Sequence, residues 1–213
     1  MVLKDIAIIG AGGLGKEVAV LIRQINQQQL TWNLVGFYDD GLPKGKKLAG
    51  QLVLGAIADL NTIDYPLAVV VAMGDPQTKA TVLSKISNPH LAFPVLIHPA
   101  ATLGLNINVG AGSIITAGCH LTVDITLGRH VLINLNSTIG HDVTIGDFSS
   151  IMPGVHLSGH VHLGNEVLLG SGASVLQSIS IGDQARVGAG AIVLQSVPSA
   201  TTVVGVPAKP KAP

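Results

Sequence analysis

Residues 133–162 read INLNST IGHDVT IGDFSS IMPGVH LSGHVH, five consecutive hexads that each begin with an aliphatic residue. The same register runs without an insertion from Ile97 to Val193, which gives (193 − 97)/6 + 1 = 17 first positions, each of them Ile, Leu or Val. The fifth position of each hexad holds a small or β-branched residue, and in one hexad it holds Cys119. A six-residue period fits neither an α-helix nor a flat strand. It fits a solenoid in which each hexad supplies one short strand and one corner.

A longer period gives the shape of this solenoid. An aliphatic residue followed by glycine recurs every 18 residues, from Val109-Gly110 to Ile181-Gly182. Eighteen residues are three hexads, so we expect three faces per coil, with glycine where a corner needs positive φ or close backbone approach. Stacked parallel strands lie about 4.8 Å apart. Residues 18 apart should therefore lie directly above one another.

The N-terminal part has a different pattern. Residues 6–9 predict a buried strand, residues 10–15 (GAGGLG) a glycine-rich turn, and residues 16–22 a helix. Strands over 34–38, ending in Asp39-Asp40, and over 69–73, ending at Gly74, follow. This order is typical of Rossmann-like βαβ folds, in which N–H groups at the helix start face an anion. The glycine turn is also typical of a tight strand–helix connection that binds nothing.

Three prolines, Pro89, Pro94 and Pro99, separate the two patterns. We predict a Rossmann-like nucleotide-sugar-binding domain over residues 1–94 and a β-helix domain with a C-terminal tail over residues 95–213. Some 95 residues hold one mononucleotide-binding half, whereas a dinucleotide needs two. A sugar nucleotide therefore suits the first domain better than NAD.

The composition narrows the class of protein. Aromatic residues make up only 3%, which suits a narrow aliphatic core, and Lys+Arg equals Asp+Glu at 12 each. A neutral chain gives no electrostatic reason to expect nucleic acid or an anionic membrane as a partner. No apolar run approaches the ~20 residues of a membrane span, and the N-terminus lacks the pattern of a signal peptide. We expect a cytoplasmic protein, in which the single Cys119 is a small core residue.

Histidines are concentrated in the repeat, and His141 has the most informative neighbours. The 18-residue rule places His141 between Val123 and Gly159, and Asp142 between Asp124 and His160. A neutral imidazole suits general-base catalysis of acyl transfer, and a carboxylate can hold its tautomer. The backbone N–H of Gly159 can serve as an oxyanion donor. The alternative is a polar corner residue without a catalytic role.

A metal site is the other chemistry that histidines suggest. His120 and His156 share a column, but they are 36 residues and so two coils apart, roughly 9.6 Å. Zinc ligands lie about 2.0–2.1 Å from the ion. We therefore predict no metal site from this pair.

Seven segments match one family in order: residues 10–16 (GAGGLGK), 35–40 (VGFYDD), 74–75, 98–99, 139–142 (IGHD), 145–148 (IGDF) and 204–209 (VGVPAK). Together they resemble the bacterial hexapeptide-repeat sugar acyltransferases of the sialic acid O-acetyltransferase and UDP-4-amino-sugar N-acetyltransferase type. The resemblance implies a left-handed β-helix, acetyl-CoA as donor, and a homotrimer with active sites between neighbouring solenoids. From the histidine spacing we expect no metal.

The resemblance also assigns roles to residues. It implies that His141 is the general base and Asp142 its partner, with the N–H of Gly159 facing the thioester oxygen and Asn134 near the site. It implies acceptor binding by Gly10, Gly12, Gly13, Leu14, Asp39, Asp40 and Gly74, and coenzyme binding by Ser150, Gly159, Gly205 and Lys209. Two positions depart from the family: Ser150 and Leu14 stand where many members carry histidine.

We therefore expect an acetyl-CoA-dependent N-acetyltransferase that acts on the 4-amino group of a nucleotide-linked amino-deoxy sugar. Three alternatives stay open at this point. They are a sugar O-acetyltransferase, a non-catalytic nucleotide-sugar-binding scaffold, and a solenoid metalloenzyme of the carbonic anhydrase kind, which metal analysis of the pure protein would identify. Turnover with an amine acceptor, or binding without turnover, distinguishes these possibilities.

Overall fold

The computed structural model describes residues 3–211, which form two compact units. The first unit contains the chain up to Gly74 together with Thr78–Pro99, and the second contains Asp75–Gln77 and the chain from Ala100 onward. Among the described residues, no helix is both long and apolar enough to cross a membrane.

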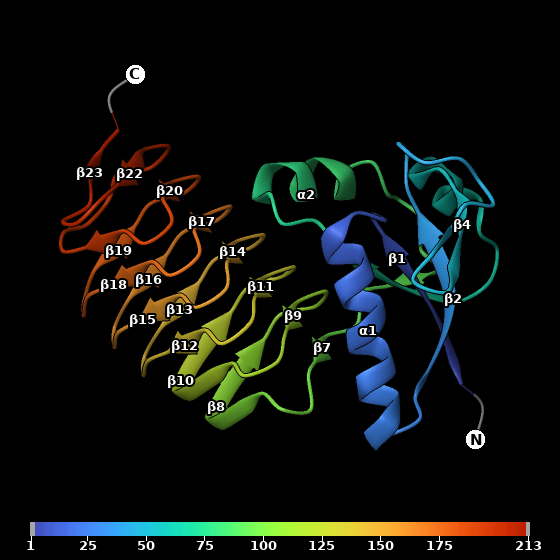
Figure 1. Ribbon diagram of the computed structural model, residues 1–213, viewed down its shortest axis with the longest axis horizontal. Coiled ribbons are helices and arrows are strands. Elements are labelled where there is room, and N and C mark those ends of the chain that lie inside the picture. Colours follow the sequence, from blue (N-terminus) through green and yellow to red (C-terminus); the bar gives the residue numbers. More distant parts are fainter. Residues whose placement is uncertain (1–2, 212–213) are drawn as a thin grey trace. The chain divides into compact units, whose positions relative to one another are not determined.

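The first unit is an α/β fold around a six-stranded sheet with strand order β3-β4-β2-β1-β5-β6 (Figure 1). Its strands are parallel except β3, which runs antiparallel to β4. The strands are β1 (Lys4–Ile9), β2 (Trp32–Tyr38), β3 (Lys47–Leu48), β4 (Gln51–Gly55), β5 (Leu67–Val71) and β6 (Leu91–Ala92). The helical segments are α1 (Gly13–Gln28), the 3₁₀-helix η1 (Ile57–Thr62) and α2 (Pro76–Leu83).

The central strands of this sheet are buried, as their apolar sequences predict. Residues Ile6–Ile9 of β1 and Val69–Val71 of β5 are at most 2% exposed. Continuous apolar runs are typical of parallel strands that are covered on both faces. Helix α1 begins at Gly13, three residues before the predicted start, because the last glycines of the turn already form its first helical turn.

The second unit is a parallel β-solenoid of the left-handed β-helix type (Figure 1). One sheet has the order β19-β16-β13-β10-β12-β15-β18-β21, and β8 also pairs with β10. The other runs β23-β22-β20-β17-β14-β11-β9. Strand β7 (Leu96–Ile97) lies in the Thr78–Pro99 segment assigned to the first unit. The strands that follow it in chain order are β8 (Thr102–Val109), β9 (Ile114–Ile115), β10 (His120–Leu127), β11 (Leu132–Ile133), β12 (Thr138–Ile139), β13 (Thr144–Ile145), β14 (Ser150–Ile151), β15 (His156–Leu157), β16 (His162–Leu163), β17 (Leu168–Leu169), β18 (Ser174–Val175), β19 (Ser180–Ile181), β20 (Arg186–Val187), β21 (Ile192–Val193), β22 (Thr202–Val204) and β23 (Lys209–Pro210).

The pairing register confirms the 18-residue stacking rule. Leu121 pairs with Ile139, and Ile139 pairs with Leu157. The first residues of the hexads point into the core: Ile133, Ile139 and Ile151 are fully buried. The fold therefore places every third hexad in one column, which is what brings the site residues together.

The fifth positions also face inward, and three of them are buried serines with a structural task. The hydroxyl of Ser149 donates to the carbonyl of Gly164 at 2.9 Å and accepts from the N–H of Val167 at 3.0 Å. Ser113 and Ser137 make corresponding bonds to later residues of the solenoid. These hydroxyls satisfy backbone groups at the corners that the strand ladders leave free.

The recurring corner glycines allow close backbone approach rather than positive φ. A Cβ on Gly128 would lie 2.7 Å from the backbone nitrogen of Asp147 and 2.9 Å from the carbonyl carbon of Gly146. No side chain fits in that space, because real Cβ atoms do not come so close to backbone. Of the two reasons for glycine that the sequence allowed, the structure supports close approach.

Candidate functional site

His141 and Asp142 form the corner between β12 and β13. Asp142 has a left-handed backbone with φ 58°, like Asn106, Asp124 and His160 in the same column, whose φ values are 56°, 55° and 57°. Asn, Asp and His are the residues most often found there besides glycine. Because φ is positive at this position, the chain turns sharply and both side chains point outward from the corner.

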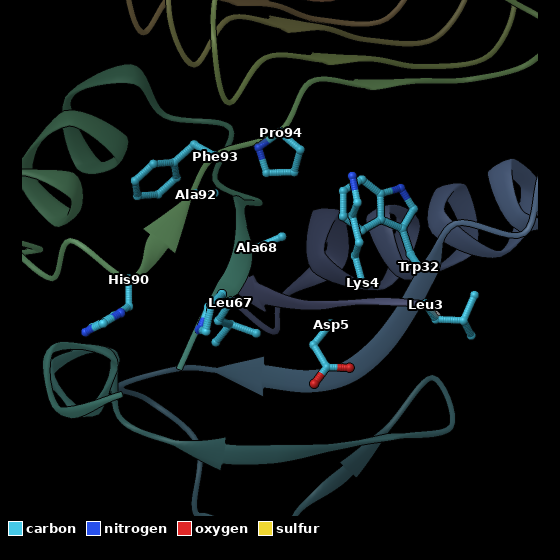
Figure 2. A pocket seen from close by; sticks show the side chains of 11 residues that line it. Leu3, Lys4, Asp5, Trp32, Leu67, Ala68, His90, Ala92, Phe93 and Pro94 are labelled. Carbon is cyan, nitrogen blue, oxygen red and sulfur yellow. The ribbon is translucent and has the colours of Figure 1, made fainter. Parts of the chain in front are cut away.

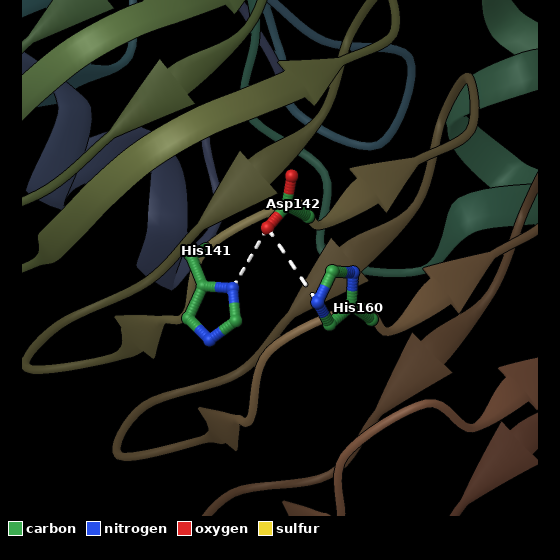
Figure 3. A group of neighbouring side chains, drawn as sticks. All are labelled: His141, Asp142 and His160. Atoms are coloured by element: carbon green, nitrogen blue, oxygen red, sulfur yellow. Dashed lines mark hydrogen bonds and ion pairs between the residues drawn. The ribbon is translucent and has the colours of Figure 1, made fainter.

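Three polar side chains meet at this corner (Figure 3). His141 Nδ1 lies 2.8 Å from Asp142 Oδ2, and His160 Nε2 lies 3.7 Å from the same oxygen. The two imidazole rings meet edge to face, with centroids 4.9 Å apart and an interplanar angle of 88°. The side chains are 49%, 46% and 49% exposed for His141, Asp142 and His160. The cluster is therefore open to solvent and to a substrate.

Gly159 lies one coil after His141 in the same column and makes room for its ring. A Cβ on Gly159 would fall on Nε2 and Cε1 of His141. The carbonyl of Gly159 accepts from the N–H of Ser178 at 3.0 Å, so its peptide is fixed in the coil. The ring thus rests over a bare backbone, as the stacking rule predicted.

The Asp142 carboxylate is held in its charged form. The hydrogen bond from His141 lowers the pKa of Asp142 from its usual 3.8, and the nearby His160 and His141 lower it further, although partial desolvation opposes them. An ionised carboxylate can only accept, so it binds the N–H form of His141 Nδ1. In the neutral imidazole this leaves the lone pair on Nε2, the atom that lies over Gly159.

Two residues assigned to the same site by resemblance lie at other places in this chain. Asn134 and Ser150 belong to the hexads of β11 and β14, in one sheet, whereas His141 follows β12 in the other. Asn134 is 7% exposed, and its Oδ1 accepts from the N–H of Leu135 at 2.8 Å. Ser150 is fully buried. Asn134 and Ser150 therefore lie on a different face of the solenoid from His141.

The two residues expected near the coenzyme from the C-terminal tail are exposed. Gly205 lies in the turn between β22 and β23, and Lys209 is the first residue of β23. The two strands form a short antiparallel pair in which Val204 is opposite Lys209. Gly205 has φ 92°, which glycine adopts without strain. The hairpin therefore presents the Lys209 ammonium group at the surface.

The glycine turn of the first unit lies at the carboxyl ends of β1 and β5. Gly10 has φ 93°, and its N–H donates to the carbonyl of Tyr38 at 2.9 Å. A Cβ on Gly15 would fall on the carbonyl oxygen of Gly10, so Gly15 permits the close approach of helix and strand. A Cβ on Gly12 or Gly13 would meet no atom within 4 Å. Gly12, Gly13 and the half-buried Leu14 therefore begin α1 with free space beside the backbone.

The two aspartates after β2 hold the backbone around this turn. Asp39 Oδ2 accepts from the N–H of Ala11 at 2.7 Å, and its Oδ1 accepts from the N–H of Gly41 at 2.8 Å. Asp40 Oδ1 accepts from the N–H of Ile57 at 2.8 Å. The family resemblance implies acceptor binding by both aspartates, and the sequence gave no sign of this structural role. Each carboxylate keeps lone pairs for a further donor.

Gly74 lies in the bend between β5 and α2, two residues after Ala72, which contacts the β1 end of the glycine turn. The N–H of Ala72 donates to the carbonyl of Ile9 at 2.8 Å, and a Cβ on Gly10 would lie 3.0 Å from the carbonyl oxygen of Ala72. Ligands of parallel α/β sheets bind at this carboxyl edge.

A pocket of 840 Å³ lies at the opposite, amino edge of this sheet (Figure 2). It is bordered by Lys4 at the start of β1, Trp32 at the start of β2, Leu67 at the start of β5, and by His90 and Phe93 around β6. It does not include the glycine turn.

Cys119 has no role in this chemistry. Its side chain is fully buried, and burial raises the pKa of its thiol. The Sγ lies 3.2 Å from the carbonyl oxygen of Asn134. The prediction that Cys119 is a core residue is confirmed.

His160 is the functional candidate to which the sequence analysis gave no role. The 18-residue rule already placed it one coil after Asp142, so its proximity was predictable. Its orientation was not, because the rule does not say which ring nitrogen faces the carboxylate. The structure shows that this nitrogen is Nε2, which lies close enough to Asp142 to interact with its carboxylate.

Comparisons with known proteins agree with both units. The family model "PglD N-terminal domain" matches residues 5–86, and the model "Hexapeptide repeat of succinyl-transferase" matches residues 160–195. A search of the curated proteins gives no match.

Solved structures match over nearly the whole chain. The acetyltransferase domain of PglB from Neisseria gonorrhoeae FA1090 is 32% identical, with a TM-score of 0.91 over 98% of this chain and 100% of that chain. WeeI from Acinetobacter baumannii AYE is 30% identical, with a TM-score of 0.88 over 98% of this chain and 100% of that chain. The H141N mutant of perosamine N-acetyltransferase from Caulobacter crescentus, in complex with CoA and GDP-perosamine, is 26% identical, with a TM-score of 0.87 over 100% of this chain and 99% of that chain. With both modules matched in order and identity above 30% over almost its full length, the chain belongs to the PglD-like family of hexapeptide-repeat acetyltransferases.

Proposed function

We propose that this protein transfers the acetyl group of acetyl-CoA to the amine of a nucleotide-linked amino sugar, with the 4-amino group of a deoxy sugar as acceptor. The single observation that carries the proposal is the His141–Asp142 pair, with the His141 ring resting over Gly159. The relatives support it: one is solved with acetyl coenzyme A, and another with CoA and GDP-perosamine. This reaction needs no metal ion.

His141 acts as the general base. Its Nδ1–H is donated to Asp142 at 2.8 Å, so Nε2 carries the lone pair that takes the proton. As the acceptor amine attacks the thioester carbonyl, a C–N bond forms and Nε2 receives one amine proton. The C–S bond then breaks, and CoA leaves as a thiolate that takes up that proton. No covalent enzyme intermediate is needed, and a positioned base contributes typically about 10²–10⁴-fold in rate.

Two mutants of the Caulobacter crescentus relative, H141N and H141A, support the choice of His141. Asp142 stabilises the imidazolium that forms during the proton transfer and keeps Nδ1 as a donor. Its lowered pKa means that it is ionised throughout the neutral range. Because the pair is half exposed, water screens part of this effect, and we expect a smaller contribution than in a buried triad.

The remaining coenzyme contacts are assigned as part of this proposal. The N–H of Gly159 faces the thioester oxygen, Lys209 interacts with coenzyme phosphates, and Gly205 shapes the turn beside them. Asn134 and Ser150 are in a different sheet from His141, so one chain does not gather the whole set. We therefore propose a homotrimer in which the site at each His141 lies against the face of a neighbouring copy that carries Asn134. Ser150 is fully buried in its own coil, so it supports that face from within.

The acceptor nucleotide binds the first unit at the glycine turn. The free N–H groups of Gly12, Gly13 and Leu14 at the start of α1 suit a diphosphate. Gly10 and Gly74 allow the ligand to approach the carboxyl edge of the sheet. Asp40 is exposed and can accept from the nucleoside, whereas Asp39 acts by holding the turn.

The test is turnover with a panel of nucleotide-linked amino and hydroxy sugars plus acetyl-CoA, followed as release of free thiol. We expect turnover only with amine acceptors, and a loss of about 10²–10⁴-fold in kcat for His141→Asn. His162→Gln is the matched control, since His162 is exposed and its Nδ1 contacts Thr144 Oγ1 at 2.8 Å, away from the pair. Thiol release equal to background with every acceptor would refute the proposal. Full activity of His141→Asn would refute the assignment of the base.

A further inference from the structure

His160 adds a third potential ligand to the catalytic pair. We propose that His141, Asp142 and His160 together bind a divalent transition-metal cation such as Zn²⁺, and that the bound ion switches acetyl transfer off. The binding rests on the geometry of the cluster alone. The inhibition rests on the proposed function, because it acts on His141 as the base.

The three ligand atoms have nearly the spacing that the ion requires. Each of His141, Asp142 and His160 offers one ligand atom, and these three atoms all lie within 4.8 Å of one another. Ligands at about 2.0–2.1 Å on a tetrahedral ion lie about 3.3 Å apart. The distances to Asp142 Oδ2, 2.8 Å from His141 and 3.7 Å from His160, lie on either side of that value. Shifts of about 0.5 Å would bring the two distances to Asp142 Oδ2 to that value, and the two histidine ligand atoms would approach each other by at most about 1.5 Å.

The surroundings permit such shifts without disturbing the backbone. All three side chains are about half exposed, so they can rotate and an ion can reach them from solvent. The corner itself is held by two backbone bonds, from the N–H of Asp142 to Val123 at 3.1 Å and from the N–H of His160 to His141 at 2.8 Å. Gly159 places no side chain between the two rings.

The kind of ligand fits a transition metal rather than magnesium or calcium. Two imidazoles and one carboxylate are a set that zinc uses with a water in the fourth position. Imidazole nitrogen is a poor ligand for Mg²⁺ and Ca²⁺, which prefer oxygen. Figure 3 shows a nitrogen of each ring directed at the Asp142 carboxylate, the point at which an ion would be held.

A bound ion would change the tautomer of His141. The metal takes the lone pair of Nδ1, so the proton of the neutral imidazole must lie on Nε2. Nε2 then donates a hydrogen bond and cannot accept the amine proton. The ion also takes the Asp142 carboxylate away from Nδ1. Both changes remove the base while leaving the fold unaltered.

Binding is measured by equilibrium dialysis of the metal-free protein against ZnCl₂, with the visible spectrum of Co²⁺ as a second readout. We expect one ion per chain in the wild-type protein, about tenfold or more weaker binding in His160→Gln, and unchanged binding in His162→Gln. Wild-type protein that binds no Zn²⁺, or His160→Gln that binds it as tightly as the wild type, would overturn the proposal.

Inhibition is measured as acetylated sugar by chromatography, because Zn²⁺ also binds the CoA thiol and disturbs thiol assays. Each variant is compared with its own rate in metal-free buffer. We expect reversible inhibition, relieved by EDTA, in the wild type and in His162→Gln, and at least about tenfold higher Zn²⁺ for the same inhibition in His160→Gln. Equal inhibition of all three proteins would overturn the switch. No turnover in metal-free buffer, with Zn²⁺ still bound, would instead refute the proposed function.

Discussion

The imidazole ring of His141 and any side chain at residue 159 exclude each other, because a Cβ on Gly159 would fall on the ring. The two residues come from successive coils, 18 positions apart. The position of the His141 ring, the proposed base, therefore depends on a residue that has no side chain.

Gly159→Ala should displace the His141 ring and lower kcat by about 10²-fold, since a shift of about 1 Å at a reacting group costs that much. Stability should fall by only about 1 kcal/mol, because the half-exposed ring can rotate away. Steady-state kinetics and urea unfolding measure the two effects. Gln177→Ala, one coil further along the same column, is the control and should leave kcat unchanged. A fully active Gly159→Ala enzyme would show that the observed ring position is not the reactive one.

Asp142→Asn should harm catalysis more than Asp142→Ala. An Asn side chain can donate its amide N–H to Nδ1 and so favour the wrong imidazole tautomer, whereas Ala only removes the partner. In a buried triad the Asn change costs about 10⁴-fold in kcat. At this half-exposed corner we expect about 10²-fold for Asn and about tenfold for Ala. Measured kcat values in the reverse order would contradict the tautomer argument.

Stability should depend on the ionisation of Asp142 at low pH. Its folded-state pKa lies below the usual 3.8, because His141 donates a hydrogen bond to it and His160 is close. The carboxylate therefore stabilises the fold above pH 3.8, and this contribution is lost as the pH falls below 3.8. Urea midpoints should show a difference between wild type and Asp142→Asn at pH 6 that shrinks toward pH 3. A difference that stays constant over this range would argue against the pair.

The sequence alone predicted the solenoid and the column arrangement of the site. A strict hexad period determines which residues face inward, and the 18-residue repeat determines which residues lie above one another. Pairing of His120 with Thr138 and of Thr138 with His156 follows from that arithmetic. The neighbours of His141 were predictable for the same reason.

Side-chain orientation was not predictable from the period. Spacing placed His160 beside Asp142 but did not indicate that its Nε2 faces the carboxylate at 3.7 Å. The role of Asp39 in the glycine turn was also hidden, because it depends on how β2 ends relative to residue 11, 28 positions earlier. Contacts between segments outside the repeat have no periodic signal in the sequence.

Ser149→Ala tests the buried hydroxyls that support the coils. The substitution leaves the carbonyl of Gly164 and the N–H of Val167 without this partner. A buried polar group that loses its hydrogen bond costs about 1–3 kcal/mol, so the free energy of unfolding should fall by that amount while kcat stays the same. Ser171→Ala, at an exposed corner, is the control and should change stability by less than about 0.5 kcal/mol. Equal effects of the two substitutions would contradict the role of the inner serines.

Asp39→Asn and Asp40→Asn separate the structural role of one aspartate from that of its neighbour. Asp39 uses both oxygens to accept backbone N–H groups, at 2.7 Å from Ala11 and 2.8 Å from Gly41. Asparagine has one acceptor oxygen, so one of these N–H groups would face an amide nitrogen that cannot accept. Ala11 is 4% exposed, and water therefore cannot replace the lost bond there.

For Asp39→Asn we expect the free energy of unfolding to fall by about 1–3 kcal/mol. We also expect the KM for the nucleotide sugar to rise by about tenfold, equivalent to about 1.4 kcal/mol of binding, because the glycine turn is no longer held. Asp40 accepts one bond, from the N–H of Ile57 at 2.8 Å, and an Asn oxygen can preserve it. Asp40→Asn should therefore leave stability nearly unchanged. An Asp39→Asn enzyme with an unchanged KM would show that the turn does not depend on Asp39. A higher KM for Asp40→Asn would support the proposed contact of Asp40 with the nucleoside.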